Sequence, residues 1–475
     1  MSTKLIRGGT IVTCEERRRV DILCHDGRIV QIGKSLEAPA ESVVIDAGGC
    51  YVTPGGIDPH THMELPMMGT VAADDFLTGT AAAAAGGTTT ILDFVSPERD
   101  QSPLEALAIW RSRAAKAAVD YGFHMTVSWW SEAFSSAMAA LVREHGVSSF
   151  KFFLAYKGRL MLSDAELIAG FLRCRELGAL VQVHAENGEL IEYLQKKIIG
   201  EGNTSPLAHA LSRPPQCEGE ATLRAITMAE TVGVPLYVVH VSAVEAANAI
   251  GAAIQRGAKV IGETLPGFLA IDESVYRSPH FDIAAGHVMS PPYRAKPHQE
   301  ALWHAINAGT LSTTGTDHCC FTKAQKRLGL GDFTKIPNGC GGVEDRLHVL
   351  WHLGVNSGRL TAERFVALTS TNAAKVFNLW PRKGSLEVGA DADLIVLDPE
   401  RSKTISAATQ HQRTDFSVWE GMQIKGAVVH TLARGHHIWA DGDLRAQGGW
   451  GRYLSRPPFG AVYENGVPSH HALLS

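Results

Sequence analysis

The sequence has little cysteine, no excess of positive charge and no long hydrophobic run, and each absence argues against a class of protein. Its 8 cysteines are scattered without a Cys-X-X-Cys pair, which disfavours a disulfide framework and favours a reducing cytoplasm. The formal net charge of -5 lacks the basic excess of a nucleic-acid binder. No apolar stretch approaches the roughly 20 residues of a membrane span, and residues 1–7 lack the apolar core of a signal peptide. We therefore expect a folded cytoplasmic protein with no nucleic-acid or membrane partner.

Short apolar or alternating runs separated by turns occupy both ends of the chain. They are Leu5–Thr13, Asp21–His25, Arg28–Ile32 and Ser42–Asp46 near the start, and Ala392–Leu397, Gln423–Leu432 and His437–Ala440 near the end. Because isolated strands of this length cannot bury a core, we predict that residues 1–52 and 385–447 form one small β domain. Residues 448–475 lack a regular period and are predicted to be an extended arm, either loose or lying on a neighbouring subunit.

Between these ends the chain alternates between strand and helix patterns. Eight apolar runs are typical of strands: Tyr51–Asp58, Thr88–Phe94, His124–Trp129, Ser149–Leu154, Ala179–His184, Val234–Val241, Lys259–Glu263 and Leu311–Asp317. Helical patterns lie at Pro103–Ala118, Asp164–Glu176, Glu218–Val232 and Ala243–Ile254. Eight strand–helix units are the number in a (β/α)8 barrel, which we predict for residues 53–384. A doubly wound open sheet fits the alternation but not the polar residues at the strand ends.

Polar residues at the ends of four of these runs predict a metal site. His60 and His62 follow the first run and are two residues apart, so their side chains point to the same side of an extended segment. The fifth run ends in His184, the sixth carries His240 and the eighth ends in Asp317. Barrel active sites lie at the carboxyl ends of the strands, and core packing does not explain four histidines and an aspartate there.

The fourth run, Ser149–Leu154, contains Lys151 in an otherwise apolar strand. A buried lysine is costly unless it is paired or neutral, so an ion pair with a carboxylate is one interpretation. The other is that burial and nearby cations lower the pKa of the amine, which then captures carbon dioxide as an anionic carbamate. Charge balance favours the carbamate, because two divalent ions, one carboxylate and a hydroxide would otherwise leave a large positive charge. We therefore predict two zinc ions per subunit, bridged by carboxylated Lys151 and hydroxide. The predicted ligands are His60, His62 and Asp317 for one ion, and His184 and His240 for the other.

Longer motifs around these residues point to a family. They are Pro54–His62, Ser149–Lys151, Val183–Gly188, Val239–Val241, Met289–Pro292, Thr316–Cys319, Asp332–Gly339 and Ser370–Lys375. Through these motifs nearly the whole chain resembles the dihydropyrimidinase and D-hydantoinase group of cyclic amidohydrolases, within the metal-dependent amidohydrolase superfamily. The resemblance implies an α/β fold with a TIM-like (β/α)8 barrel and a small β-sandwich domain, a carboxylated lysine, a binuclear metal centre and usually a homotetramer.

The resemblance also implies roles for residues outside the metal set. Tyr156 would bind the substrate carbonyl, and Ser290 and Asn338 would hold the ring through main-chain groups. Leu65 and Phe153 would belong to loops that receive the ring substituent, with ordinary packing as the alternative for both.

The predicted reaction is hydrolytic ring opening of a cyclic ureide, a 5,6-dihydropyrimidine or a 5-substituted hydantoin, to an N-carbamoyl amino acid. A hydroxide bridging the metals would attack the amide carbonyl, whose oxygen would be stabilised by one metal and by Tyr156. Asp317 would accept a proton as general base and deliver it to the departing ring nitrogen as general acid.

Three alternatives remain open. Dihydroorotase-like enzymes typically carry an arginine two residues after the second histidine, where this chain has Glu64. No arginine is evident to pair with an anionic substituent, which favours an uncharged ring. An allantoinase fits the metal ligands but fits the Ser290 and Asn338 segments less well. A non-enzymatic scaffold that has lost its ligands is disfavoured, because all six ligand positions are filled.

Overall fold

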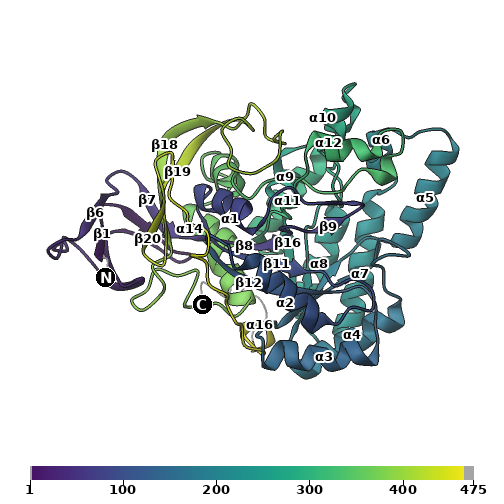
Figure 1. The fold of residues 1–475 in the computed structure, drawn as a ribbon, viewed down its shortest axis with the longest axis horizontal. Coiled ribbons are helices and arrows are strands. Elements are labelled where there is room, and N and C mark those ends of the chain that lie inside the picture. The colour runs from purple at the N-terminus through teal and green to yellow at the C-terminus, as the bar shows by residue number, and fades with distance from the viewer. Residues whose placement is uncertain (1–2, 465–475) are drawn as a thin grey trace.

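The computed structural model describes residues 3–464 and shows a barrel of parallel strands beside sheets built from the two ends of the chain (Figure 1). The barrel strands follow one another in chain order, and each neighbouring pair is parallel. A bridge between Thr61 and His318 brings the two edges of this sheet together. The strands are β8 (Gly56–Thr61), β11 (Thr88–Val95), β12 (Asp120–Val127), β13 (Ser149–Phe153), β14 (Leu180–His184), β15 (Leu236–Val238), β16 (Val260–Thr264) and β17 (Leu311–Thr314). The predicted barrel is confirmed.

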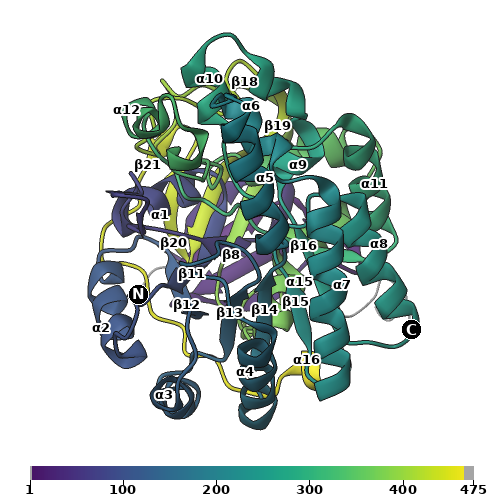
Figure 2. The same cartoon turned by 90° about the vertical axis from the view of Figure 1, so that its right-hand side faces the viewer.

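Helices surround the barrel strands, as Figure 2 shows for α2, α3, α4, α7, α8 and α11. The longer helices are α1 (Phe76–Ala85), α2 (Pro103–Ala114), α3 (Glu132–Arg143), α4 (Asp164–Leu177), α5 (Gly188–Gly200), α7 (Pro215–Val232), α8 (Val244–Gln255) and α11 (Lys296–Asn307). Shorter ones are α6 (Pro206–Leu211), α9 (Pro266–Ala270), α10 (Phe281–Gly286), α12 (Lys323–Lys326), α13 (Arg346–Leu350), α14 (Ala362–Val366) and α15 (Asn372–Val376). The four predicted helices correspond to α2, α4, α7 and α8, with shifted ends. Across residues 3–464, no helix has both the length and the apolar character to cross a bilayer.

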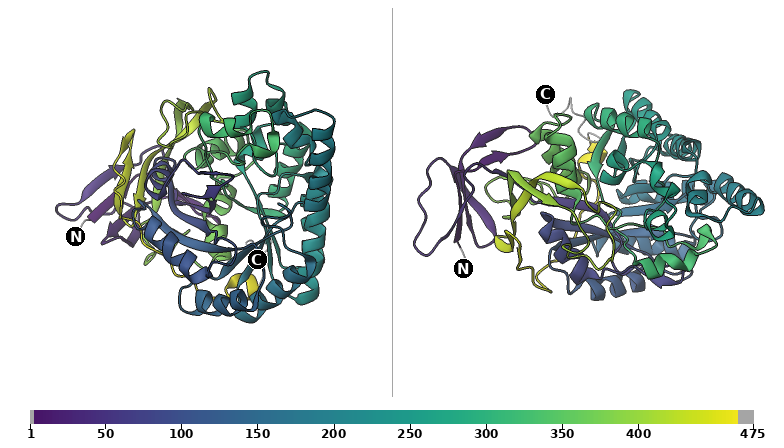
Figure 3. Two further views of the ribbon diagram at one scale, coloured as in Figure 1. Left: turned by 45° about the vertical axis from the view of Figure 1, so that its right-hand side comes forward. Right: turned by 90° about the horizontal axis from the view of Figure 1, so that it is seen from above.

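The two ends of the chain share a sheet, as predicted. Strand β7 (Tyr51–Pro54) pairs with β2 (Thr10–Val12) on one side and with β18 (Leu394–Thr404) on the other. The other strands of this sheet are β3 (Arg17–Arg19), β19 (Gln423–Ala433), β20 (His436–Ala440) and β21 (Asp443–Leu444). A second sheet contains β1 (Thr3–Arg7), β4 (Asp21–His25), β5 (Arg28–Gly33) and β6 (Val43–Asp46). Figure 3 shows these strands beside the barrel in two further views. A short hairpin, β9 (Pro66–Met67) and β10 (Thr70–Val71), follows β8.

The first predicted barrel strand, Tyr51–Asp58, is in fact two strands, so its assignment was wrong. β7 belongs to the sheet of the chain ends, and the barrel strand β8 starts only at Gly56. Gly55 separates them where the backbone passes close to β11, since a Cβ there would lie 2.2 Å from Thr89 Oγ1. The hydrophobicity pattern of the run does not reveal such a change of sheet, because β7 and β8 are both buried.

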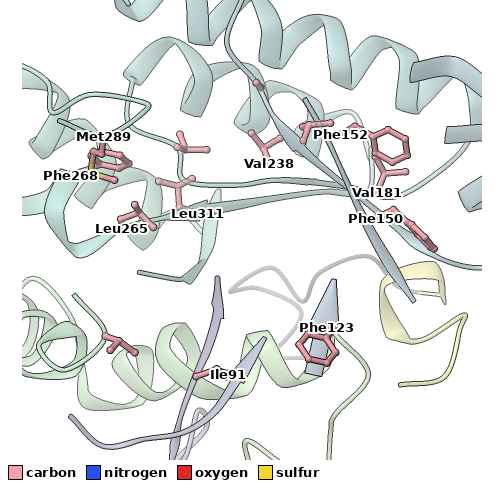
Figure 4. Packing of buried hydrophobic residues seen from close by; sticks show 14 of the residues in the cluster. Ile91, Phe123, Phe150, Phe152, Val181, Val238, Leu265, Phe268, Met289 and Leu311 are labelled. Atoms are coloured by element: carbon pink, nitrogen blue, oxygen red, sulfur yellow. The ribbon is translucent and has the colours of Figure 1, made fainter. Parts of the chain in front are cut away.

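The side chains of β13 point alternately to the barrel interior and to the surrounding helices, and Lys151 points to the interior. Its neighbours Phe150 and Phe152 belong to the core cluster shown in Figure 4. Phe152 packs on Phe171 of α4 at a ring-centroid distance of 5.4 Å, so it faces the helical layer. Because successive side chains of a strand point to opposite faces, Lys151 faces the interior.

The described part of the predicted arm, residues 448–464, lies on the barrel of its own chain, whereas we expected it to be loose or to lie on a neighbouring subunit. The amide of Leu454 donates to the Tyr121 carbonyl at 2.7 Å, and that of Arg456 donates to Gly146 at 3.0 Å. The segment ends in α16 (Ala461–Glu464). Residues 465–475 of the predicted arm lie outside the described residues, and the domain boundaries stay a prediction.

A buried charge cluster joins the barrel to the sheet of the chain ends. Lys383 lies 2.6 Å from Asp120, the first residue of β12, and 2.6 Å from Asp393, which precedes β18. Asp391 lies 3.0 Å from the same ammonium, and Arg434 pairs with Asp120 at 3.1 Å. Burial disfavours the ammonium, but the three carboxylates raise the pKa of Lys383 above its usual value. The cluster therefore holds both parts of the molecule through paired charges.

We predict that Lys383→Met lowers the free energy of unfolding by about 3–5 kcal/mol, because buried carboxylates lose their counter-ion. Denaturant unfolding followed by circular dichroism measures the change. The matched control is Lys196→Met, whose exposed ammonium pairs with Glu192 and whose loss should cost less than about 1 kcal/mol. Equal unfolding midpoints for the two variants would contradict a structural role of the cluster.

Candidate active site

His60, His62 and Asp317 converge at the carboxyl ends of the first and last barrel strands. The Nε2 atoms of both histidines lie 3.1 Å from Asp317 Oδ1. Two donors on one tetrahedral zinc, each about 2.0 Å from the ion, would be separated by about 3.3 Å, which is close to this spacing. The three side chains therefore fit a single ion.

Asp58 sets the position of this trio. Its carboxylate accepts hydrogen bonds from the Thr316 amide at 3.1 Å, the Thr316 hydroxyl at 2.6 Å and the His60 amide at 3.1 Å. It thus ties β8 to the turn before Asp317. Asp317 itself has a φ of 52°, in the left-handed region where a non-glycine residue is strained and needs such support.

His184 and His240 form a second pair of imidazoles beside the first. His184 Nδ1 and His240 Nε2 are 2.9 Å apart, and the His240 ring stacks on His60 at 5.4 Å. His240 Nδ1 is buried and has no hydrogen-bond partner among residues 3–464. Burial lowers the pKa of both His184 and His240, so both rings are neutral, the form that ligates metal.

Lys151 lies against His60 and lines the same cavity as His184 and His240. Its Nζ is 2.9 Å from His60 Nε2 and 4.2 Å from the centre of the Phe94 ring. Burial lowers the pKa of Lys151 to about 8, against the opposing influence of Asp317 and Glu263. Burial therefore raises the neutral fraction of the amine, the form that carbamate formation requires, above that of an exposed lysine.

Two buried carboxylates that sequence analysis missed orient the histidines. Glu263 of β16 accepts from His60 Nδ1 at 2.7 Å and from the His240 amide at 2.9 Å. Glu186 accepts from His184 Nε2 at 2.7 Å. The bonds to His60 Nδ1 and His184 Nε2 leave the other nitrogen of each ring facing the centre. The available signals were slight: Glu263 ends an apolar run, and Glu186 follows His184 by two residues.

A salt bridge to Arg213 keeps Glu186 ionised. Arg213 Nη1 lies 2.6 Å from Glu186 Oε2, and both side chains are almost fully buried. Burial alone would favour the protonated acid, but Arg213 and His184 lower the pKa of Glu186 to about 2. The carboxylate therefore stays a hydrogen-bond acceptor for His184 throughout the physiological pH range.

Another buried group of ligand-type side chains lies beside Asp317. Asp74 accepts from His318 Nε2 at 2.9 Å and from Cys320 Sγ at 3.1 Å, while His318 Nδ1 accepts from the Gly342 amide at 3.1 Å. These hydrogen bonds engage both ring nitrogens of His318. The group therefore anchors the loop that carries Asp317.

A cavity of about 180 Å³ opens over the convergent side chains. Of the eleven predicted site residues, His60 lies fully buried beneath, and the other ten line it: His62, Leu65, Lys151, Phe153, Tyr156, His184, His240, Ser290, Asp317 and Asn338. Asn338 Nδ2 donates to Ser290 Oγ at 3.1 Å, and burial raises the pKa of Tyr156, which keeps its phenol protonated. The structure thus brings the whole predicted set to one place.

One sequence expectation about this cavity was wrong. No arginine was evident near the ring substituent, yet Arg159 lines the cavity. The chain turns back after β13, where the amides of Arg159 and Leu160 both donate to the Tyr156 carbonyl at 3.0 Å. This turn brings Arg159 to the rim, and its geometry is not visible in the strand and helix patterns.

Comparisons with known proteins agree with this geometry. A model of the amidohydrolase family matches residues 51–443. The chain is 47% identical to a D-hydantoinase of Geobacillus stearothermophilus over 463 residues, which cover 97% of this chain and 98% of that protein. It is 46% identical to a dihydropyrimidinase of Rattus norvegicus over 461 residues, covering 96% of this chain and 89% of that protein. The crystal structure of a dihydropyrimidinase from Brevibacillus agri superposes with a TM-score of 0.95 at 45% identity, covering 96% of this chain and 99% of that one. The chain therefore belongs to the amidohydrolase family, as an enzyme of its dihydropyrimidinase and D-hydantoinase group.

Proposed function

We propose that the enzyme opens 5,6-dihydropyrimidines and 5-substituted hydantoins to N-carbamoyl amino acids. The observation that carries this proposal is the convergence of three imidazoles, Lys151 and Asp317 on the floor of one cavity, with the His60 imidazole directly beneath. The rim of this cavity is mainly apolar. Relatives named D-hydantoinase and dihydropyrimidinase, similar over nearly their full length, support the same substrate classes.

We propose that His60, His62 and Asp317 hold one zinc ion, that His184 and His240 hold another, and that carboxylated Lys151 is shared between them. The donor spacing, the neutral rings of His184 and His240 and the lowered pKa of Lys151 support this set. When bound, the ions would supply a water of lowered pKa and an electrophile for the carbonyl oxygen.

The protein groups would bind the ring and move the proton. The Tyr156 phenol would donate to the oxygen of the amide carbonyl, where negative charge develops. Asp317 would take the proton of the attacking water and deliver it to the ring nitrogen as the amide bond breaks. Main-chain groups near Ser290 and Asn338 would hold the ureide edge of the ring, and Leu65 and Phe153 would contact the substituent.

Glu64, at the position where dihydroorotase-like enzymes typically carry an arginine, supplies no cation to the cavity. Its carboxylate lies 2.7 Å from Lys116 and accepts from the Phe76 amide at 3.2 Å, so it belongs to the start of α1. It is absent from the residues that line the cavity.

We also propose that the enzyme is a homotetramer in the cytoplasm. Light scattering of the purified protein measures its mass and so tests the tetramer.

We predict that Lys151→Ala loses most of its zinc and nearly all activity, because the anionic bridge is gone. Elemental analysis of the purified variant measures the metal, and acetate should partly restore activity by replacing the carbamate. Lys196→Ala, at an exposed lysine, is the control and should keep its metal. Two zinc ions per subunit with normal turnover in Lys151→Ala would rule out the bridging role.

We predict that Asp317→Asn keeps its fold but loses about 100- to 10,000-fold in kcat, because the amide cannot carry the proton. Steady-state hydrolysis of dihydrouracil measures the loss, and circular dichroism checks the fold. A variant that is folded and hydrolyses dihydrouracil at a near-normal rate would show that Asp317 is not the proton shuttle.

We predict that dihydrouracil and alkyl or aryl hydantoins are hydrolysed and that dihydroorotate is far slower. An apolar pocket discriminates by only about 1–3 kcal/mol per methylene, whereas a carboxylate joined directly to the ring would be buried among apolar side chains. A hydrolysis panel that also contains allantoin tests this choice. Efficient turnover of dihydroorotate with none of dihydrouracil would overturn the proposed substrate class.

A further inference from the structure

The rim of the active-site cavity combines an apolar wall with a cation, Arg159, that has no partner among residues 3–464. Leu65, Met67, Phe153 and Leu160 supply apolar surface above the convergent ligands. Arg159 lines the same rim, and its side chain is exposed to solvent. A ring substituent that extends past this apolar surface would therefore meet the Arg159 guanidinium.

Other cations near the rim are already neutralised by carboxylates. Lys157 lies 2.6 Å from Glu189 and 3.0 Å from Glu192. Arg213 lies 2.6 Å from Glu186. Arg159 differs, because within residues 3–464 no carboxylate lies within 4.0 Å of its guanidinium and the side chain makes no hydrogen bond. Its charge and its five N–H donors thus remain available to a ligand.

Arg159 also stands where the cavity meets a second one of about 170 Å³. Both cavities are lined by Met68, Tyr156 and Asn338 as well as by Arg159. A substituent long enough to leave the first cavity would therefore reach the arginine at the junction. A group attached directly to the ring lacks the connecting methylenes that would carry it to this junction.

We propose that this enzyme accepts ring substituents that end in an anion, with an apolar stem along Leu65 and Phe153 and a terminal carboxylate on Arg159. The inference rests on the proposed function and extends its substrate class to carboxyalkyl ureides. Pairing at an exposed rim changes affinity modestly, by about two- to fivefold. It also weakens as salt screens the charges.

The test compares two substrates of nearly equal shape, 5-(2-carboxyethyl)hydantoin and 5-(2-carbamoylethyl)hydantoin. For each enzyme the kcat/KM of the acid is divided by that of the amide. We expect this ratio to fall about two- to fivefold in Arg159→Gln relative to the unmodified zinc-loaded enzyme. Arg159→Lys should retain most of the ratio, and raising the ionic strength should narrow the difference between the unmodified enzyme and Arg159→Gln.

Lys157→Gln is the matched control, because it removes a neighbouring charge that is already paired. Its ratio should equal that of the unmodified enzyme. Equal ratios in the unmodified enzyme and Arg159→Gln, with both hydantoins hydrolysed, would overturn this inference and leave the proposed function standing. An equal fall in Lys157→Gln and Arg159→Gln would overturn the assignment to Arg159. No hydrolysis of dihydrouracil or of either hydantoin by the zinc-loaded enzyme would contradict the proposed function and this inference with it.

Discussion

Burial of an amine inside a closed parallel barrel is the constraint on which the site depends. Lys151 is only 2% exposed, and the apolar side chains on either side of it are buried as well. An isolated ammonium at this depth is strongly unfavourable, so the position favours a neutral or chemically modified side chain. Burial lowers the pKa of His62, His184 and His240 for the same reason, so these imidazoles are neutral. Together with His60 they make a donor set suited to divalent metal.

The proposed metal ligands are held in position by buried carboxylates that are not ligands themselves. Glu263 reaches from the seventh barrel strand to the His60 ring on the first and also holds the His240 backbone. Asp58 joins the first strand to the turn before Asp317. These bonds connect strands that lie far apart in the chain, so closure of the barrel and orientation of the ligands depend on one another.

The metal ligands that sequence analysis predicted from the residues alone share a local signature, whereas the substrate-binding residues followed only from the family resemblance. His60 and His62 are two apart at the end of a strand, and Lys151 interrupts an apolar run, so strand geometry alone directs their side chains. The remaining parts have no local signature. The bond of Glu263 to His60 spans 203 residues, the change of sheet at Gly55 depends on contact with Thr89, and Arg159 reaches the rim through a turn. Each of these follows from packing between distant segments rather than from periodicity.

The central claim is that Lys151 carries a carbamate shared between two metal ions. The most direct measurement is carbon-13 NMR of the zinc-loaded enzyme prepared with carbon-13 bicarbonate. The account predicts one carbamate signal that is absent from Lys151→Ala. A wild-type enzyme that binds two zinc ions per subunit and turns over substrate without that signal would contradict it.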